Sequence, residues 1–385
     1  MTSGGVVVPP ATIGMLGGGQ LGRYALIAAR TMGYRTVVLD PDPRAPAGAI
    51  ADKHLVAAFD DPDALARLGA ECAVVTTEFE NPPAAALRRL AEQTCVAPAP
   101  ESVAIAQDRI AEKGFLVAHG LPVGPYGVLA SVTDVMYASQ DTSLVWPARL
   151  KTARLGYDGK GQAVVAGPTE LRAAWQSLGG VPCVLERALD LVSEVSVVAA
   201  RSAAGEFVAY EVTENTHVDG ILDVSVAGGV APVVAAEATE LAGRIADQLD
   251  YVGVLAVEFF VVAAGSTTRL LVNELAPRPH NSGHWTLDGG RTNQFAQQIR
   301  AICGLPLGDP AMTAGGVAMV NLLGDLWERD EPDWAGALGP DTALHLYGKA
   351  EPRPGRKMGH LTAWADTPEA ARARALAARE RLLRR

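Results

Sequence analysis

Apolar positions follow two different periods in the first hundred residues of the chain. Continuous apolar runs are typical of buried strands, and apolar residues that recur every three or four positions are typical of helices. On this basis the sequence predicts strand 12–17, helix 19–34, strand 35–40, helix 61–70 and strand 72–80. This alternation predicts a parallel, doubly wound sheet that binds ligands at the carboxyl ends of its strands.

The pattern changes beyond about residue 109. Apolar segments with many glycines predict strands within 161–167, 194–212 and 253–275. After "ICGLPLGDP", Pro and Gly separate short strands ahead of a last helix at 367–383, whose alanines and arginines suit a largely solvated helix. The sequence therefore predicts two further domains after the first.

The composition describes a globular protein. With 385 residues, of which 49% are hydrophobic and 20% charged, the chain is long enough for two or three cores. Its net charge of −10 argues against a nucleic-acid partner, which needs a basic face. No apolar run reaches the length that spans a bilayer, and the first residues do not resemble a signal peptide, so we expect no membrane partner. The four scattered cysteines predict a protein of the reducing cytoplasm.

A glycine loop follows the first predicted strand. Gly17, Gly19 and Gly22 have the G-x-G-x-x-G spacing of a dinucleotide-binding loop, and Asp40 ends the next strand, where such proteins place an acid. The motif alone leaves two hypotheses open. The loop binds NAD, or it serves another ligand by the same physical means.

Two acidic residues carry the strongest chemical signal. The strands that flank the turn "AAGSTT" predict a hairpin, and a hairpin symmetric about residue 266 pairs Glu258 with Glu274. Like charges directly opposite each other in apolar strands are unfavourable, and Mg²⁺ would remove the conflict. The alternative is that one or both acids point to solvent. We favour the metal because "NELAPRPH" places Asn273, Arg278 and His280 beside the second acid.

Two further segments suggest nucleotide binding. A strand ending at Lys151 leads into "LGYDGKGQ", whose glycines would let backbone amides approach a polyphosphate, although many surface hairpins also carry Gly and Lys. Another strand ends at Glu186, where backbone groups could bind an adenine edge, and Glu194 could accept hydrogen bonds from ribose hydroxyls. A solvated turn is the alternative for this second segment.

Together these segments resemble one family within the ATP-grasp superfamily. The stretches "LGGGQLGRY", "TTEFENPP", "QDRIAEKGFL", "NTHVDGILDVSVA", "NELAPRPHNSGHWTLDG" and "HLYGKAEPRPGRKMGHLT" are similar to those of the 5-(carboxyamino)imidazole ribonucleotide synthases, the PurK family. The resemblance implies a mixed α/β and α+β fold: a Rossmann-like domain at 1–112, an ATP-grasp domain at 113–303 and a small β-rich C-terminal domain at 304–385. It also implies that ATP activates bicarbonate, which carboxylates 5-aminoimidazole ribonucleotide in purine biosynthesis.

The resemblance also implies residue roles. ATP would contact Arg109, Lys151, Gly156, Tyr157, Asp158, Gly159, Lys160, Gly161, Gln162, Glu186, Arg187, Ala188, Leu189, Glu194, His217, Asn273 and Glu274. The ribonucleotide would contact Gln20, Leu21, Glu80, Asn81, Asn281, Lys349, Arg356 and Lys357. Arg278 and His280 would act on bicarbonate and the amine together with Tyr157 and Asp158, and Glu258 and Glu274 would bind magnesium. Ala153 and Leu155 depart from the Arg and Gly that are common in the family.

On this interpretation the first glycine loop and the helix after it hold the ribonucleotide or its phosphate, and no NAD is bound. Two other functions remain as alternatives. One is a formate-dependent glycinamide ribonucleotide transformylase, which shares the fold and metal site, and the other is an NAD-binding protein that uses only the first domain. The resemblance further suggests a homodimer.

Overall fold

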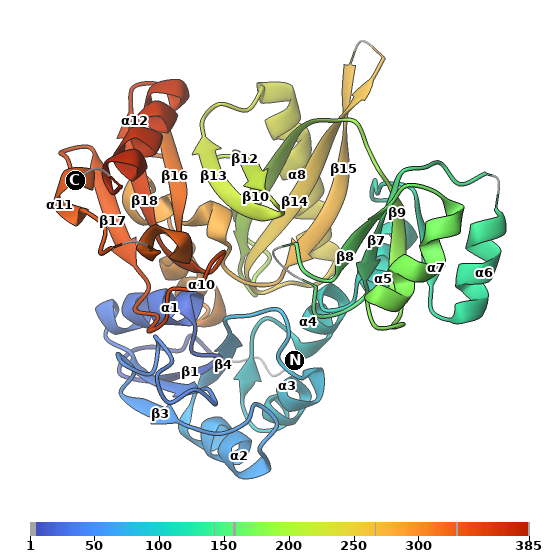
Figure 1. Ribbon diagram of the computed structural model, residues 1–385. Coiled ribbons are helices and arrows are strands. Elements are labelled where there is room, and N and C mark those ends of the chain that lie inside the picture. The colour runs from blue at the N-terminus through green and yellow to red at the C-terminus, as the bar shows by residue number, and fades with distance from the viewer. Residues whose placement is uncertain (1–4, 142, 157–158, 266, 329, 384–385) are drawn as a thin grey trace.

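A parallel sheet forms the N-terminal part of the protein (Figure 1). The computed structural model describes residues 5–141, 143–156, 159–265, 267–328 and 330–383. The five strands lie in the order β3-β2-β1-β4-β5, and every pair is parallel. Their bounds are β1 Thr12–Leu16, β2 Arg35–Leu39, β3 Lys53–Leu55, β4 Val74–Thr77 and β5 Cys95–Val96. The predicted parallel sheet is therefore confirmed.

Helices cover both faces of this sheet. Helix α1 (Gln20–Thr31) packs on one face against Ile13 and Met15, whereas α2 (Pro62–Glu71) and α3 (Ala84–Ala91) share a core with Val37 and Leu39 on the other. Helix α2 begins where the Asp61 carboxylate accepts hydrogen bonds from the first free amides of the helix. This is the doubly wound arrangement that the sequence predicts.

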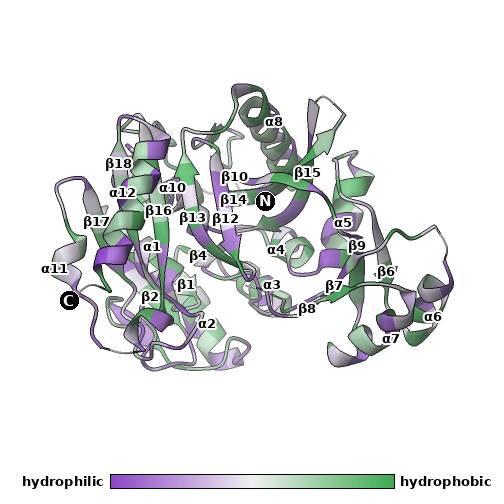
Figure 2. Ribbon diagram, turned by 45° about the horizontal axis from the view of Figure 1, so that its top comes forward, coloured by the Kyte–Doolittle hydropathy of each residue, from purple (hydrophilic) through white to green (hydrophobic). Residues whose placement is uncertain are grey.

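A nine-stranded sheet forms the centre of the molecule. Eight of its strands lie in the order β15-β14-β10-β12-β13-β16-β18-β17, and β11 pairs with β10. The bounds are β10 Leu191–Arg201, β11 Phe207–Ala209, β12 Thr213–Val218, β13 Ile221–Ala227, β14 Gly253–Ala264, β15 Thr267–Ala276, β16 Gly316–Leu323, β17 Thr342–Leu346 and β18 Lys357–Ala365. Figure 2 shows β16 largely in the green of apolar residues. Because β13 pairs with β16, the sheet continues across the boundary predicted at residue 304, and the domain boundaries stay predictions.

Two long helices pack on this sheet. Helix α8 (Pro232–Gln248) buries Leu241 and Ile245 against strands β10 and β14. Helix α12 (Pro368–Arg381) buries Ala371, Ala375 and Ala378 completely against β16 and β18. The expectation of a largely solvated last helix is therefore wrong for one of its faces, because alanines at intervals of three and four residues form a flat apolar stripe.

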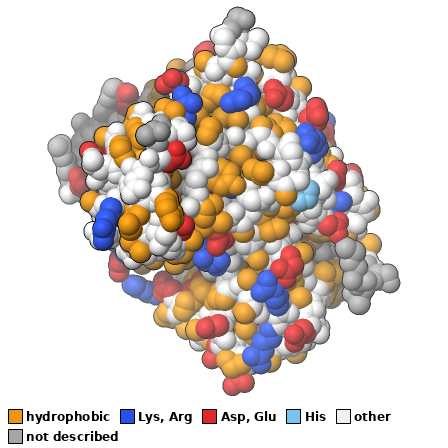
Figure 3. Space-filling view, turned by 90° about the vertical axis from the view of Figure 1, so that its right-hand side faces the viewer, with side chains coloured by type: hydrophobic (Ala, Val, Ile, Leu, Met, Phe, Trp, Pro, Cys, Tyr) orange, Lys and Arg blue, Asp and Glu red, His pale blue; other side chains and the backbone are white. Residues whose placement is uncertain are grey.

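A smaller four-stranded sheet lies on the right in Figure 1. Its order is β6-β9-β7-β8, with bounds β6 Tyr126–Leu129, β7 Ala148–Thr152, β8 Gln162–Val165 and β9 Cys183–Arg187. Helices α6 (Val132–Gln140) and α7 (Pro168–Ser177) share its core. Figure 3 views the molecule from this side, where hydrophobic side chains are interspersed with acidic and basic ones.

The remaining helical segments are shorter than α8 and α12. They are α4 Pro100–Ala106, α5 Arg109–Ala118, α9 Thr286–Gly289, α10 Gln294–Ile302, α11 Trp334–Ala337 and the 3₁₀ turns η1 Asn281–Gly283 and η2 Gly324–Trp327. Helix α10 buries Phe295 and Ile299 against α1 and so fixes the N-terminal sheet to the central sheet. In the part of the chain that the structure describes, no helix has the length and apolarity needed to cross a membrane.

Candidate active site

Glu258 on β14 and Glu274 on β15 lie directly opposite each other, as predicted. The hairpin is not symmetric about residue 266, however, because Phe259 pairs with Val272 where that symmetry would place Asn273. The register shifts by one residue between Glu258 and Phe259, so that a bulge at Asn273 restores the pairing of the two acids. The predicted pair is correct, and the bulge is the feature that produces it.

The two carboxylates have different electrostatic surroundings. Burial and the neighbouring Glu274 raise the pKa of Glu258 to about 7. Burial also opposes ionisation of Glu274, but Arg109 outweighs it and lowers the pKa of this carboxyl. Asn273 directly precedes Glu274, and its side-chain oxygen is buried without a hydrogen-bond partner among the described residues. Two opposed carboxylates and an unpartnered amide oxygen are ligands that suit Mg²⁺.

Helix α5 contributes a cation to this site. Arg109 Nη1 lies 2.8 Å from Glu274 Oε2, and Nη2 donates to the Gly156 carbonyl at 3.4 Å. One turn along the helix, the buried Glu112 carboxylate accepts a hydrogen bond of 2.6 Å from the Leu275 amide. Burial raises the pKa of Glu112 to about 8. These two contacts fix helix α5 to β15 immediately beside Glu274.

A cavity lies beside the acidic pair, between the two sheets. Its lining includes the predicted ATP residues Lys151, Glu186, Arg187, Ala188 and Leu189, together with Lys113, Gly124, Pro125, Arg149, Leu191, Phe260 and Val272. Glu186 lies between two lysines, 2.7 Å from Lys113 Nζ and 2.6 Å from Lys151 Nζ. Burial opposes its ionisation, but the lysines prevail and lower the pKa of Glu186 to about 2. One carboxylate beside two ammonium groups leaves positive charge for a polyphosphate.

Sequence reasoning missed Glu112 and Lys113. Both residues are buried: Lys113 lines the cavity, and Glu112 binds the backbone beside Glu274. A signal was available, because Arg109, Glu112 and Lys113 are three and four residues apart on a helix and so share one face.

The described residues of the glycine loop after β7 contact Arg109 and the turn between β12 and β13. Gly156 contacts Arg109, and Gly159 packs closely against Asp219 and Gly220 at the turn between β12 and β13. Leu155 has a φ of +62°, a left-handed conformation that favours glycine. The departure from the family pattern therefore falls on a strained position. The loop also includes Lys160, Gly161 and Gln162, whereas the predicted Tyr157 and Asp158 lie outside the described residues.

The predicted ribose and phosphate contacts lie on neighbouring strands. His217 on β12 has Nδ1 3.1 Å from Oε2 of Glu194 on β10. Burial lowers the pKa of His217, but its hydrogen bond to Glu194 and the charge of that carboxylate outweigh burial and raise it. The structure thus brings together two residues that the resemblance assigns to ATP.

Arg278 and His280 follow β15 and face the acidic pair and the N-terminal sheet. Arg278 forms an ion pair with Glu80, and its Nε is buried without a hydrogen-bond partner among the described residues. Burial lowers the pKa of Arg278 to about 10. His280 Nε2 lies 3.2 Å from Glu258 Oε1, while its Nδ1 accepts a hydrogen bond from the Ser282 amide. Burial, followed by Arg278, holds the pKa of His280 well below its ordinary value, so this ring is neutral near pH 7.

The amides of the first glycine loop have protein partners. Gly19 and Gly22 donate to the partly buried Glu78 carboxylate at 2.8 and 3.0 Å, and Gly18 donates to Asp40 at 2.7 Å. Carboxylates at the ends of β2 and β4 thus lie at the positive end of α1, and the predicted contact of this loop with the ribonucleotide or its phosphate stays a prediction.

The predicted ribonucleotide residues gather near this loop. Lys349 Nζ donates to Gln20 Oε1 at 2.7 Å, and the neighbouring Leu21 is buried. Lys349 and Arg356 line a second cavity together with Arg44 and Arg353, two residues that sequence reasoning missed. Lys357 opens β18 and acts electrostatically on Glu258, at the acidic pair.

Asn281 and Asn81 differ in their surroundings. The Asn281 amide group exchanges two hydrogen bonds with Asn321, at 2.7 and 3.0 Å, which leave one N–H and one oxygen lone pair of Asn281 for a further contact. Asn81 is partly buried in the segment after β4, next to Glu80. The substrate roles of both residues stay predictions.

Three family models match the sequence. They describe a ribonucleotide synthetase preATP-grasp domain at residues 10–107, an ATP-grasp domain at 114–295 and a phosphoribosylaminoimidazole carboxylase C-terminal domain at 317–374. Fold and site together define the chain as an ATP-grasp enzyme, an ATP-dependent ligase.

Comparison with individual relatives identifies the family within this class. The N5-carboxyaminoimidazole ribonucleotide synthase of Brucella melitensis biotype 1 is 44% identical over 357 residues, which cover 92% of this chain and 96% of that protein. The crystal structure of an ADP complex of a PurK synthetase aligns with a TM-score of 0.90 at 39% identity, covering 98% of both chains. A synthase from Aspergillus clavatus, solved with ADP and 5-aminoimidazole ribonucleotide, aligns with a TM-score of 0.85 at 27% identity, covering 97% and 99%. The chain belongs to the N5-carboxyaminoimidazole ribonucleotide synthase (PurK) family.

Proposed function

We propose that this enzyme uses ATP to carboxylate 5-aminoimidazole ribonucleotide with bicarbonate, giving 5-(carboxyamino)imidazole ribonucleotide, ADP and phosphate for purine biosynthesis. The observation that carries the proposal is that the candidate ATP site lies next to the candidate carboxylation residues. The candidate ATP site consists of the acidic pair Glu258 and Glu274 and the Lys-rich cavity. His280 contacts Glu258 of this pair, and Arg278 contacts Glu80, which follows a strand of the N-terminal sheet.

ATP would occupy the cavity beside the acidic pair. Leu189 and Phe260 offer apolar surface to the base, and Lys113 and Lys151 offer charge to the phosphates. Arg109 would exchange part of its ion pair with Glu274 for a phosphate oxygen. Gly156 lies beside Arg109 and Gln162 pairs with Lys151, so the described ends of this loop lie next to the groups that would bind the phosphates.

Magnesium would be held by Glu258 and Glu274, with the Asn273 oxygen beside them. When bound, the ion would neutralise charge on the transferred phosphate. The carboxylates would then be ionised together, since a cation removes the repulsion that raises the pKa of Glu258.

The two chemical steps can be assigned to residues of this chain. A bicarbonate oxygen attacks the terminal phosphorus and ADP leaves, with Arg278 holding the bicarbonate through its planar guanidinium group. The exocyclic amine then forms the bond to the carboxyl carbon, phosphate leaves with the electrons of the broken bond, and this departing phosphate takes up the proton that the amine loses. Because neutral His280 accepts at Nδ1 and carries its proton on Nε2, we assign it to orienting groups by donation and not to accepting that proton.

Two alternatives are separable by experiment. The formate-dependent transformylase would use formate and glycinamide ribonucleotide, and an NAD-binding protein would bind NAD at the first glycine loop. The hydrogen bonds from Gly18, Gly19 and Gly22 to Asp40 and Glu78 count against NAD. The test is ADP release measured with each combination of bicarbonate or formate and of the two ribonucleotides, with NAD binding followed by calorimetry. ADP release that depends on formate while bicarbonate is inert would contradict the proposal.

We also propose that the protein works as a cytoplasmic homodimer. The four cysteines Cys72, Cys95, Cys183 and Cys303 are free thiols, which suits a reducing compartment. Nucleic acid is not an expected partner, given the net charge of −10. Light scattering coupled to size-exclusion chromatography distinguishes a dimer from the 40.1 kDa monomer.

A further inference from the structure

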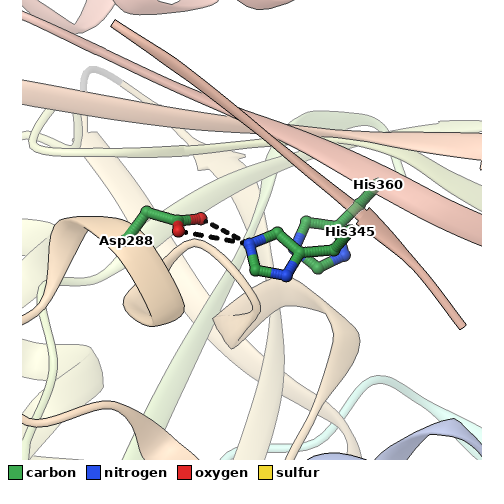
Figure 4. A group of neighbouring side chains, drawn as sticks. All are labelled: Asp288, His345 and His360. Carbon is green, nitrogen blue, oxygen red and sulfur yellow. Dashed lines mark hydrogen bonds and ion pairs between the residues drawn. The ribbon is translucent and has the colours of Figure 1, made fainter. Parts of the chain in front are cut away.

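A buried group of rings lies where three segments of the chain meet. Asp288 in α9 accepts a hydrogen bond from His345 on β17, whose Nε2 lies 2.9 Å from Oδ2. Opposite His345 in the strand pairing is His360 on β18, and the two imidazole rings are stacked, with centroids 4.5 Å apart and planes within 10°. Figure 4 shows Asp288 pointing toward the near edge of His345, with the ring of His360 behind it.

This group has the composition of a metal site but not the geometry of one. One possible ligand atom from each of Asp288, His345 and His360 lies within 4.8 Å of the others, and a Zn²⁺ ion accepts such ligands. The lone pairs of an imidazole lie in its ring plane, however, so the lone pairs of these stacked rings lie in two nearly parallel, separated planes and do not meet at one ion. In addition, His345 Nε2 already contacts Asp288 and His360 Nδ1 already contacts the Tyr347 hydroxyl at 2.9 Å.

The contacts continue from the rings to the candidate ribonucleotide site. Two residues beyond His345, Tyr347 bonds to His360 and is fully buried. Its ring lies 5.4 Å from the Lys349 ammonium group, within the range of a cation–π contact. Lys349 Nζ in turn donates to Gln20 Oε1 at 2.7 Å and to the Lys357 carbonyl at 2.6 Å. Tyr347 and Lys349, which follow β17, are therefore held at the candidate ribonucleotide site by their contacts with His360 and Gln20.

The same rings approach Gln20 from its other side. The His284 ring lies 5.0 Å from His360, and its Nε2 is 3.5 Å from Gln20 Nε2. Tyr24, one helical turn after Gln20 on α1, packs edge-on to both His345 and Tyr347. If His345 were displaced, we would therefore expect both Gln20 and Lys349 to shift.

The carboxylate of this group lies at a partly exposed edge, whereas the fully buried rings are neutral. His284 and His360 are fully buried, and burial, followed by the neighbouring histidines, holds the pKa of each well below its ordinary value. These two rings are neutral at physiological pH. The carboxylate of Asp288 bonds to His345 at the partly exposed edge, so it anchors the β17–β18 hairpin without burying an unpaired charge.

We propose that Asp288 and His345 are positioning residues for the ribonucleotide, which hold Lys349 and Gln20 in place through the stacked ring of His360 and the ring of Tyr347. The inference rests on the proposed function, because it concerns the ribonucleotide site of that reaction. It predicts an effect on this substrate and none on ATP, whose candidate cavity is lined by other residues.

The test compares four variants in the full-length enzyme. His345→Phe keeps a ring to stack on His360 but cannot bond to Asp288, and Asp288→Ala removes the same bond from the other side. Each is expected to raise the KM for 5-aminoimidazole ribonucleotide about 10-fold, the scale of one lost hydrogen bond, with the KM for ATP unchanged. Asp288→Asn keeps an oxygen acceptor for His345 and is expected to stay within about 2-fold of the parent protein.

Asp247→Asn is the matched control for general destabilisation. It weakens the ion pair with Arg201 that joins α8 to the last residue of β10, and it is expected to lower Tm without a change in either KM. Equal rises in both KM values, or failure of Asp288→Asn to restore the parent KM, would overturn the proposal. One zinc ion per chain, lost in His345→Phe, would also overturn it in favour of a metal site. Failure of the proposed function itself is distinguishable, because the parent protein would then show no turnover that depends on the ribonucleotide.

Discussion

Arg109 Nη1 lies 2.8 Å from Glu274 Oε2, so that the first residue of α5 is paired with a residue 165 positions later on β15. This ion pair lowers the pKa of one member of the acidic pair, while the other member, Glu258, has a raised pKa. The site therefore contains one carboxylate that is ionised before any cation arrives and one that a cation would ionise.

The acidic pair gives the first prediction. Glu274→Gln keeps the shape of the side chain but removes the charge that Arg109 and magnesium would share. We expect ATP turnover to fall at least about 100-fold at low magnesium, the scale found when metal sites are perturbed, while Tm changes little. The matched control is Glu237→Gln, an exposed glutamate on α8. Near-normal turnover in Glu274→Gln would show that this carboxylate does not hold the metal.

Glu186 gives a prediction for the dependence of stability on pH. Its pKa is lowered to about 2 by Lys151 and Lys113, against the effect of burial, and an unfolded glutamate titrates near 4.3. The stabilisation is thus present above about pH 4.3 and is lost as the pH falls toward 2, with an upper limit of about 3 kcal/mol. We expect the free energy of unfolding of Glu186→Gln to decrease less than that of the parent protein between pH 5 and pH 3. Parallel curves in urea titrations would contradict the assigned ion pairs.

The second cavity gives a prediction about substrate affinity. Arg356 lines it with Lys349 and Arg44, and a phosphate group bound there would accept charged hydrogen bonds. Arg356→Ala is expected to raise the KM for 5-aminoimidazole ribonucleotide about 10-fold or more and to leave the KM for ATP unchanged. Arg291→Ala, which removes an exposed ion pair with Asp309, serves as the control. An equal rise in both KM values would mean that Arg356 belongs to a solvated face.

The strained loop residue gives a prediction about stability. Leu155 is 71% exposed and has a φ of +62°, so its side chain gains little packing for an unfavourable backbone conformation. Leu155→Gly is expected to increase the free energy of unfolding by about 0.5–1 kcal/mol, whereas Leu155→Ala, which keeps the Cβ atom, should give no such gain. A loss of stability in the glycine variant would show that Leu155 makes contacts that repay the strain.

The sequence predicted the elements whose patterns are local. Strands β1, β2 and β4 and the hairpin of β14 and β15 follow from runs of apolar residues, and the pairing of Glu258 with Glu274 follows from the hairpin. The bulge at Asn273 was not predictable, because a symmetric hairpin and a bulged one have the same apolar pattern.

Other features depended on contacts between distant segments. The glycine loop has the sequence of a phosphate-binding loop, but Glu78, which fills it, lies 59 residues beyond Gly19. The stacking of His345 on His360 likewise requires the pairing of β17 with β18, and its link to Asp288 requires the packing of α9. Periodicity cannot reveal such contacts, since it reports only which face of an element is buried.

The central claim is that ATP hydrolysis by this enzyme is coupled to carboxylation of an amine. The most direct measurement is ¹³C NMR of the reaction with ¹³C-bicarbonate, ATP, magnesium and 5-aminoimidazole ribonucleotide, with ADP quantified in the same sample. The account predicts a new carbamate signal that grows in step with ADP, one for one, and needs the ribonucleotide. ADP release without any carbamate signal, or a labelled product formed only from ¹³C-formate, would contradict it.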